Sequence, residues 1–285
     1  MKTVHFVVSG IKGPMGGADW PKQRPWVDHR FGIYRDFTFR SLQGQSEQDF
    51  LPVLMVNRRY KYARKVFGAL EPEGLNLREW RTGTAGKADA WMLREAAKAD
   101  RVYYTRVDTD DMLARPYIEF VRSQKLTNPL TLMMFRHGYC YQIEQALVGY
   151  WGWSLTPFYT LVMPSAMFVD RHAELIGTHR SIHKVVPRAG GDFRMFPRKE
   201  APPDPVTAPY GASNMFCVGI HSKNTTSGMH GCHRNFLGHI ARIRSWYPMI
   251  HEHTMRQHGC YVRVTANATE RYGYVHGELQ RLEDR

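Results

Sequence analysis

The sequence is poor in cysteine and has no long apolar run and no internal repeat. Its cysteines are too few and too scattered for a disulfide-stabilised scaffold: Cys140, Cys217, Cys232 and Cys260. No stretch approaches the roughly 20 apolar residues of a membrane-spanning helix. The start, MKTVHFVVSGIKG, lacks the long apolar core and the cleavage site of a signal peptide. We therefore expect a protein without a transmembrane segment that stays in the cytoplasm.

The common nucleotide-binding loop motifs are also missing. A stretch rich in Gly and Pro, Gly10 to Pro25, follows the first expected strand, where α/β domains often meet a nucleotide. Its text GIKGPMGG has neither the GxGxxG spacing nor a P-loop lysine. Lys12, Lys22 and Arg24 could contact phosphates. A flexible surface loop is an equally good interpretation.

What the sequence does have is positive charge and enough apolar residues for a sizeable core. The formal net charge is +13 and 43% of the residues are hydrophobic. The charge implies an anionic partner, such as nucleotide phosphates, a nucleic acid or an acidic membrane surface. The basic residues are spread along the chain, so a polybasic tail is not indicated. The arginines of the first expected helix, Arg30, Arg35 and Arg40, are assigned to a solvated face.

Alternating strand-like and helix-like segments indicate an α/β fold. The first half reads β-α-β-α-α-β, which favours a mostly parallel sheet with helices on both faces. Two short strands joined by a turn at His137-Gly138 are expected after Asn128, then a strand at Asn214 to Ile220 and a basic helix at Cys232 to Trp246. The elements expected in the first half are the strands Thr3 to Ser9 and Phe50 to Val56, and the helices Val27 to Gln45, Tyr60 to Ala69 and Thr84 to Ala99.

One stretch, RVYYTRVDTDDMLA at residues 101–114, predicts a ligand site. An apolar, β-branched and aromatic run favours a buried strand, and Asp108, Asp110 and Asp111 follow it at once. Carboxylates this close repel one another unless a cation lies among them, and oxygen ligands suit magnesium, manganese or calcium. Alternatively, Asp110 or Asp111 caps a helix that starts near Met112.

Three segments in order resemble a known family. TRVDTDDML resembles the metal-binding DxD signature of nucleotide-sugar glycosyltransferases with the GT-A fold. FTFRSLQGQSEQDFLPVLMV and the later GIHSKNTTS resemble passages of the putative rhamnosyltransferase family, and the likeness covers much of residues 1–226. The resemblance implies a Rossmann-like, mostly parallel mixed sheet flanked by helices. It also implies a nucleotide-sugar-binding half (1–128), an acceptor-side half (129–226) and a helical, basic, His-rich C-terminal extension (227–285).

The resemblance also implies roles for individual residues. Asp110, Asp108 and His221 would hold Mn²⁺ or Mg²⁺, with Asp111 in support. A nucleoside-diphosphate sugar would be the donor, and its contacts would be Asp108, Arg106, Lys12, Asp89, Lys223 and Asn224. Arg106 would brace the carboxylates or pair with the diphosphate. The expected activity is metal-dependent transfer of a sugar, rhamnose being one candidate, to a hydroxyl of a glycan, a lipid-linked acceptor or DNA.

An inverting reaction needs a carboxylate that takes the proton of the acceptor hydroxyl. Asp192, flanked by glycines in AGGDF, is the first choice, and Asp170 and Glu144 are rivals. An ordinary turn aspartate is the alternative interpretation of Asp192, and residue type alone favours it. The family resemblance suggests an acidic residue after the FYTLV strand, where this chain has Met163.

Other functions remain open from the sequence. A structural zinc site could draw on Cys217, His221, His230, Cys232, His233 and His239, although no CxxC pair is present. Charge and aromatic content permit nucleic-acid binding, including a phage-type glycosyltransferase that modifies hydroxylated DNA bases. A contact with an anionic membrane surface is also compatible with the charge. An aromatic patch, from Tyr150 to Tyr159, suits either core packing or stacking on sugars or bases.

Overall fold

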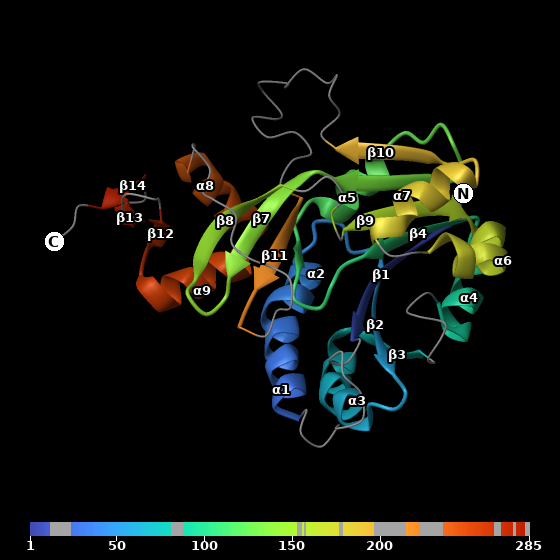
Figure 1. Ribbon diagram of the computed structural model, residues 1–285, viewed down its shortest axis with the longest axis horizontal. Coiled ribbons are helices and arrows are strands. Elements are labelled where there is room, and N and C mark those ends of the chain that lie inside the picture. Colours follow the sequence, from blue (N-terminus) through green and yellow to red (C-terminus); the bar gives the residue numbers. More distant parts are fainter. Residues whose placement is uncertain are drawn as a thin grey trace.

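A seven-stranded mixed sheet runs through the middle of the molecule, which is described here by a computed structural model (Figure 1). The strand order is β10-β6-β9-β4-β1-β2-β3, and every strand runs in one direction except β9, which is antiparallel to both β4 and β6. The α/β fold class expected from the sequence, a mostly parallel mixed sheet flanked by helices, is confirmed. The structure describes residues 1–11, 24–80, 88–152, 156, 158–176, 179–196, 215–222, 236–264, 269–275 and 278–282.

The central strands are buried on both faces, which explains why their sequences are continuous apolar runs. β1 pairs in parallel with β4 on one side and β2 on the other, so that the carboxyl ends of all three meet at the same edge of the sheet. The strands of this sheet are β1 (Thr3–Ile11), β2 (Leu51–Asn57), β3 (Asn76–Trp80), β4 (Arg101–Arg106), β6 (Thr131–Phe135), β9 (Tyr159–Pro164) and β10 (Asp192–Phe196).

Helices cover the sheet on both sides. One apolar cluster joins the sheet to α4 (Ala90–Ala96), α6 (Ser165–Leu175) and α7 (His179–Arg188). On the other face a second cluster includes α5 (Tyr117–Ser123). A third cluster packs α1 and α3 against β2. The helices of that cluster and their continuations are α1 (Arg24–Ile33), the π-helix η2 (Tyr34–Phe39), α2 (Arg40–Gln43), α3 (Lys61–Phe67) and the 3₁₀-helix η3 (Gly68–Glu73).

A second, four-stranded sheet lies beside the first, in the order β5-β11-β7-β8. Helices α8 and α9 and a three-stranded antiparallel sheet follow it and pack against it through the apolar cluster of the second face. Figure 1 shows the C-terminal elements at the end of the molecule away from α4 and α6. Their bounds are β5 (Met112–Leu113), β7 (His137–Gln142), β8 (Leu147–Gly152), β11 (Phe216–Ile220), α8 (Phe236–Trp246), α9 (Pro248–His258), β12 (Tyr261–Val264), β13 (Thr269–Val275) and β14 (Glu278–Leu282).

Three expectations about elements were wrong, and one strand was missed. No helix starts near Met112, because β5 follows the aspartates and pairs with β11. The strands β6 and β7 do not form a hairpin, since they belong to different sheets and His137 lies inside β7. The half-exposed edge strand β3 was not expected at all. The C-terminal extension is not only helical, because it contains the sheet β12-β13-β14.

The aromatic patch belongs to the core where the structure describes its side chains. Phe158 and Tyr159 are both fully buried, and the ring of Phe158 stacks on Phe216 with 4.3 Å between centroids. This favours core packing over a stacking platform for these two residues. The division into segments at residues 128 and 226 stays a prediction.

Candidate active site

The aspartate turn after β4 is fixed by backbone contacts on both sides. The amide of Val107 donates to the carbonyl of Val8 in β1, and the amide of Asp111 donates to the carbonyl of Asp108. The chain then enters β5, which pairs with β11. The turn therefore lies at the carboxyl edge of the central sheet, where open α/β sheets bind ligands.

Asp110 meets two basic side chains from distant parts of the chain. His221, which follows β11, places Nε2 at 3.3 Å from Asp110 Oδ2, across 111 residues of sequence. Arg30 of α1 forms an ion pair with the same oxygen at 2.7 Å. Burial opposes ionisation of Asp110, but the hydrogen bond with His221 and the charge of Arg30 outweigh it and lower its pKa. Asp110 is thus an ionised, buried acceptor.

Gly219 makes this meeting possible. A Cβ built on Gly219 would overlap the carbonyl oxygen of Asp110, so only glycine permits β11 to approach the turn this closely. The amide of Gly219 also donates to Asp111 Oδ1 at 3.1 Å. Burial, together with the charges of Asp110 and Asp108, raises the pKa of Asp111 well above its usual range. Asp111 therefore serves to hold β11 against the turn.

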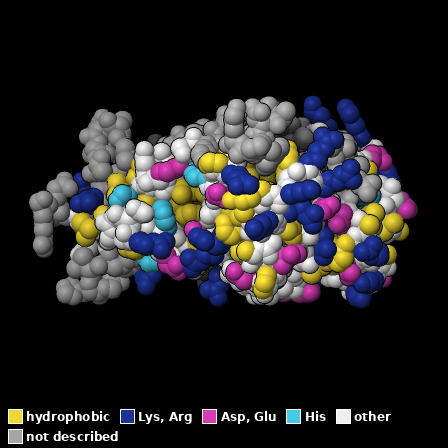
Figure 2. Space-filling view, turned by 90° about the horizontal axis from the view of Figure 1, so that it is seen from below, with side chains coloured by type: hydrophobic (Ala, Val, Ile, Leu, Met, Phe, Trp, Pro, Cys, Tyr) yellow, Lys and Arg dark blue, Asp and Glu magenta, His cyan; other side chains and the backbone are white. Residues whose placement is uncertain are grey.

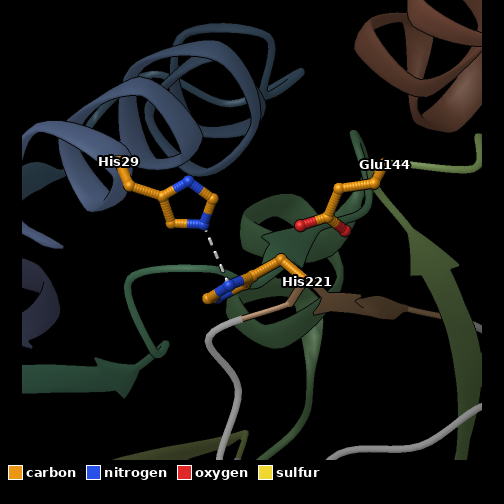
Figure 3. Close-up of side chains that lie close together, drawn as sticks. All are labelled: His29, Glu144 and His221. Carbon is orange, nitrogen blue, oxygen red and sulfur yellow. Dashed lines mark hydrogen bonds between the residues drawn. The ribbon is translucent and has the colours of Figure 1, made fainter. Parts of the chain in front are cut away.

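Two further side chains face His221 from the opposite side of its ring. His29 of α1 places Nε2 at 3.2 Å from His221 Nδ1. Glu144, in the turn between β7 and β8, points into the same space (Figure 3). One donor atom from each of His29, Glu144 and His221 lies within 4.8 Å of the others. Glu144 is anchored by the amide of Ser222, which donates to Oε1 at 2.7 Å.

The other residues assigned to donor contacts divide into two groups. Arg106 donates to Asp108 Oδ1 at 2.8 Å, so it does brace a carboxylate of the turn. Asp89 accepts from the amide of Met92 as the N-cap of α4, and a contact with the donor stays a prediction. Lys12, Lys22, Lys223 and Asn224 lie outside the described residues, as does the proline-rich stretch 197–209.

The structure does not bring the first-choice bases to this edge. Asp192 opens β10, which runs parallel to β4 three strands away, and therefore lies toward the opposite edge, on the order of 20 Å from Asp108. Its carboxylate accepts from Arg194 Nε at 2.9 Å. Asp170 lies exposed on α6, which begins where β9 ends at that same opposite edge. Of the three carboxylates considered, Glu144 is the one at the site.

The structure excludes Cys217 from a zinc site that contains His221. Cys217 is fully buried in the apolar core, and burial raises the pKa of its thiol. It precedes His221 by four residues on an extended strand, which separates the two by roughly 13 Å. Two ligands of one ion cannot lie that far apart. His230, Cys232 and His233 lie outside the described residues, and the side chain of His239 is not described.

Sequence reasoning missed His29 and misplaced Arg30. Arg30 was assigned to a solvated face, yet its side chain is only 16% exposed and faces Asp110. Both residues belong to the polar side of α1, and the helical period alone gives no sign that this side meets the end of β11. The available signal in the sequence was that His29 and Arg30 stand next to each other, just before the apolar positions of the helix.

The side chains present fit a divalent cation. Asp110 already attracts the positive charge of Arg30 in a buried position, so the corner stabilises a cation. Two imidazoles and a carboxylate converge within ligand reach of one another, and such a mixture of nitrogen and oxygen donors is typical of manganese, iron or zinc sites.

The comparisons with known proteins agree with the family expected from the sequence. The family model described as putative rhamnosyl transferase matches residues 22–188, more than half of the chain. The search of curated protein sequences found no match to this chain. Within the described ranges, none of the helices combines the length and apolar character that crossing a membrane requires.

Among solved structures the likeness is distant. The chain is similar to S. aureus TarS 1-349 in complex with UDP (10% identity, 77% of this chain and 61% of that chain, TM-score 0.43). For TarS 1-349 in complex with UDP-GlcNAc the identity is 10%, the match covers 90% of this chain and 67% of that chain, and the TM-score is 0.42. In another match to TarS 1-349 the chain spans about half of that protein, 52%. These similarities support no statement about activity. On the evidence of the family model, the chain belongs to the putative rhamnosyl transferase family of glycosyltransferases.

Proposed function

We propose that the protein transfers a sugar from a nucleoside-diphosphate sugar to an acceptor hydroxyl, with a divalent metal ion at the corner where Asp110 meets His221. The observation that supports this best is the contact itself: His221 Nε2 lies 3.3 Å from Asp110 Oδ2, at the carboxyl edge of a mostly parallel sheet. Membership of the family makes sugar transfer the expected reaction.

The charges at this corner suit a leaving diphosphate. Cleavage of the sugar–phosphate bond leaves extra negative charge on the diphosphate, and a bound divalent ion supplies Lewis-acid stabilisation of that charge. Arg30 and Arg106 each pair with an aspartate of the turn. Both guanidinium groups lie largely buried beside the turn, so they can add stabilisation to the diphosphate without large rearrangement.

Each aspartate of the turn holds a different part of the site in place. Asp110 holds the His221 ring by accepting from Nε2. Asp108 holds Arg106, and Asp111 holds β11 through the amide of Gly219. An inverting reaction also requires a proton acceptor near the acceptor hydroxyl. Glu144 is the exposed carboxylate that reaches this corner from the β7–β8 turn, and it is available for that role only if it does not bind the ion.

The experiment that tests the proposal is hydrolysis of a panel of nucleotide sugars. Rhamnose and hexose donors of UDP, GDP and dTDP are incubated with the protein, with and without Mn²⁺, and the released nucleoside diphosphate is measured. We expect release from one class of donor, dependent on the added ion. Release that is unaffected by a chelator would contradict the metal requirement, and no release from any donor would contradict the proposed activity.

The net charge of +13 favours an anionic acceptor, and DNA is the second candidate. On the face shown in Figure 2, however, described Lys and Arg side chains are interspersed with Asp and Glu and form no continuous stripe. That face therefore gives no support to a DNA acceptor, and we rank a glycan or lipid-linked acceptor first. Salt-dependent retention of the protein on duplex DNA, measured by fluorescence anisotropy, would reverse this order.

A further inference from the structure

We infer that His29, Glu144 and His221 Nδ1 form a three-ligand site for a divalent transition-metal ion, and that Asp110 orients His221 from behind without binding the ion. The inference rests on the proposed function for the presence of an ion at this corner. It goes further by naming His29 as a ligand, a residue that is neither part of the DxD motif nor the late histidine expected from the family resemblance. It also selects manganese, zinc or a similar ion over magnesium.

The two ring nitrogens of His221 face different partners. Nε2 faces Asp110 at 3.3 Å, and Nδ1 faces His29 Nε2 at 3.2 Å. The side chain of His221 is fully buried, so its orientation is fixed by these contacts and by the strand that precedes it. The two sides of the ring are therefore chemically distinct.

Proton positions decide which side can bind an ion. A carboxylate that forms an ion pair only accepts hydrogen bonds, and Asp110 Oδ2 forms an ion pair with Arg30 at 2.7 Å. His221 Nε2 must then carry the ring proton, which leaves the lone pair on Nδ1 directed toward His29 and Glu144. A carboxylate behind a histidine that binds metal through its other nitrogen is a recurrent arrangement in metal sites.

His29 and Glu144 complete the set. With the ring proton of His221 on Nε2, the donor of the hydrogen bond between the two rings is His29 Nε2, and a move of that proton to His29 Nδ1 leaves both facing nitrogens with lone pairs. Glu144 adds a carboxylate whose Oε1 is already fixed by the amide of Ser222. The side chains are held by three separate elements, α1, the β7–β8 turn and the end of β11 (Figure 3).

The composition of the set indicates the class of ion. Imidazole ligands suit zinc, copper, iron and nickel, and carboxylates also suit manganese, whereas magnesium prefers an all-oxygen shell that retains several waters. Three protein ligands leave coordination positions open, as in catalytic metal sites. Glu144 is exposed, so an ion held by these side chains would be accessible from solvent to diphosphate oxygens.

The test is direct binding of Mn²⁺, Zn²⁺ and Mg²⁺ to the whole protein by isothermal titration calorimetry, without any donor. We expect one Mn²⁺ or Zn²⁺ per chain and affinity for Mg²⁺ that is weaker by roughly a hundredfold. His29→Gln and Glu144→Gln should each lower Mn²⁺ affinity about tenfold or more. Matched controls on α6, His172→Gln and Glu174→Gln, should bind like the wild type. Echo-modulation spectra of bound Mn²⁺ should show two imidazole nitrogens, and one in His29→Gln.

The outcomes separate this inference from the proposed function. If Asp110→Asn removes the ion while His29→Gln binds it fully, the ion lies on the Nε2 side and the inference is wrong, although metal-dependent transfer survives. If Glu144→Gln keeps full Mn²⁺ affinity but loses sugar transfer, Glu144 is the base and the ligand set is wrong. Equal melting temperatures of the variants, in the absence of metal, exclude a folding defect as the cause.

Discussion

Gly219 passes so close to the carbonyl group of Asp110 that no side chain fits between them. This contact joins β11 to the turn after β4, and His221 follows two residues later. The position of His221 beside Asp110 therefore depends on a residue that takes no part in chemistry.

Replacing Gly219 with Ala should separate β11 from the turn. The added methyl group overlaps backbone, which cannot rotate away, so we expect a loss of about 1–3 kcal/mol in the free energy of unfolding. Mn²⁺ affinity should fall with it, since His221 moves relative to His29. Urea titration and calorimetry measure the two effects. Gly32→Ala in α1, where a Cβ meets nothing within 4 Å, is the control and should be neutral or stabilising.

The positive charge of Arg30 beside Asp110 competes electrostatically with an ion held by His29, Glu144 and His221. Arg30→Gln leaves Asp110 with one cationic partner fewer, so the metal-free protein should lose about 1–3 kcal/mol of stability. Added Mn²⁺ should raise the melting temperature more in this variant than in the wild type, whereas affinity for inorganic pyrophosphate should fall. Arg35→Gln removes an exposed arginine paired with Asp36 and serves as the control. Weaker Mn²⁺ binding by Arg30→Gln than by the wild type would refute the competition.

His5 should make stability depend on pH. Its burial, and then the charge of Arg122, lower its pKa to about 3. Between pH 3 and the ordinary value near 6.5 the unfolded chain binds the extra proton, so this contribution is complete above pH 6.5 and is lost as the pH falls. From pH 7 to pH 5 the loss attributable to His5 should be at most about 2 kcal/mol. Urea titrations of wild type and His5→Gln at both pH values measure it; equal pH slopes would contradict the assignment.

Asp192 should be dispensable for the reaction. It lies toward the edge opposite to the aspartate turn and pairs with Arg194. Asp192→Asn should therefore change donor hydrolysis by no more than about twofold and lower stability by about 1 kcal/mol or less. A loss of turnover of a hundredfold, with an unchanged melting temperature, would restore Asp192 as the base.

Much of the fold could be predicted from periodicity and residue type. The strands at Thr3 and Leu51 and the strand before Asp108 are continuous apolar runs, and their burial on both faces explains that text. The edge strand β3 escaped notice because it is half exposed and includes Arg78 and Glu79. Edge strands make fewer apolar contacts, so their sequences contain fewer apolar residues.

The site was harder to predict, for a geometric reason. Asp110 and His221 come from the ends of two strands and were recognisable through the family resemblance. His29 and Arg30 reach the site from a helix, and no local pattern tells which side of a helix meets a distant strand end. Asp192 illustrates the reverse error: flanking glycines mark a turn, but the edge at which that turn lies depends on the direction of β10 in the sheet.

The most direct measurement is donor turnover by Asp110→Asn and by its exposed counterpart Asp170→Asn, with Mn²⁺ and the donor identified in the hydrolysis panel. Asp110→Asn removes the charge that orients His221 and keeps the shape of the side chain. We predict a fall in turnover of about a hundredfold or more for Asp110→Asn, with a folded protein, and turnover close to wild type for Asp170→Asn. Equal activity of the two variants would contradict the account.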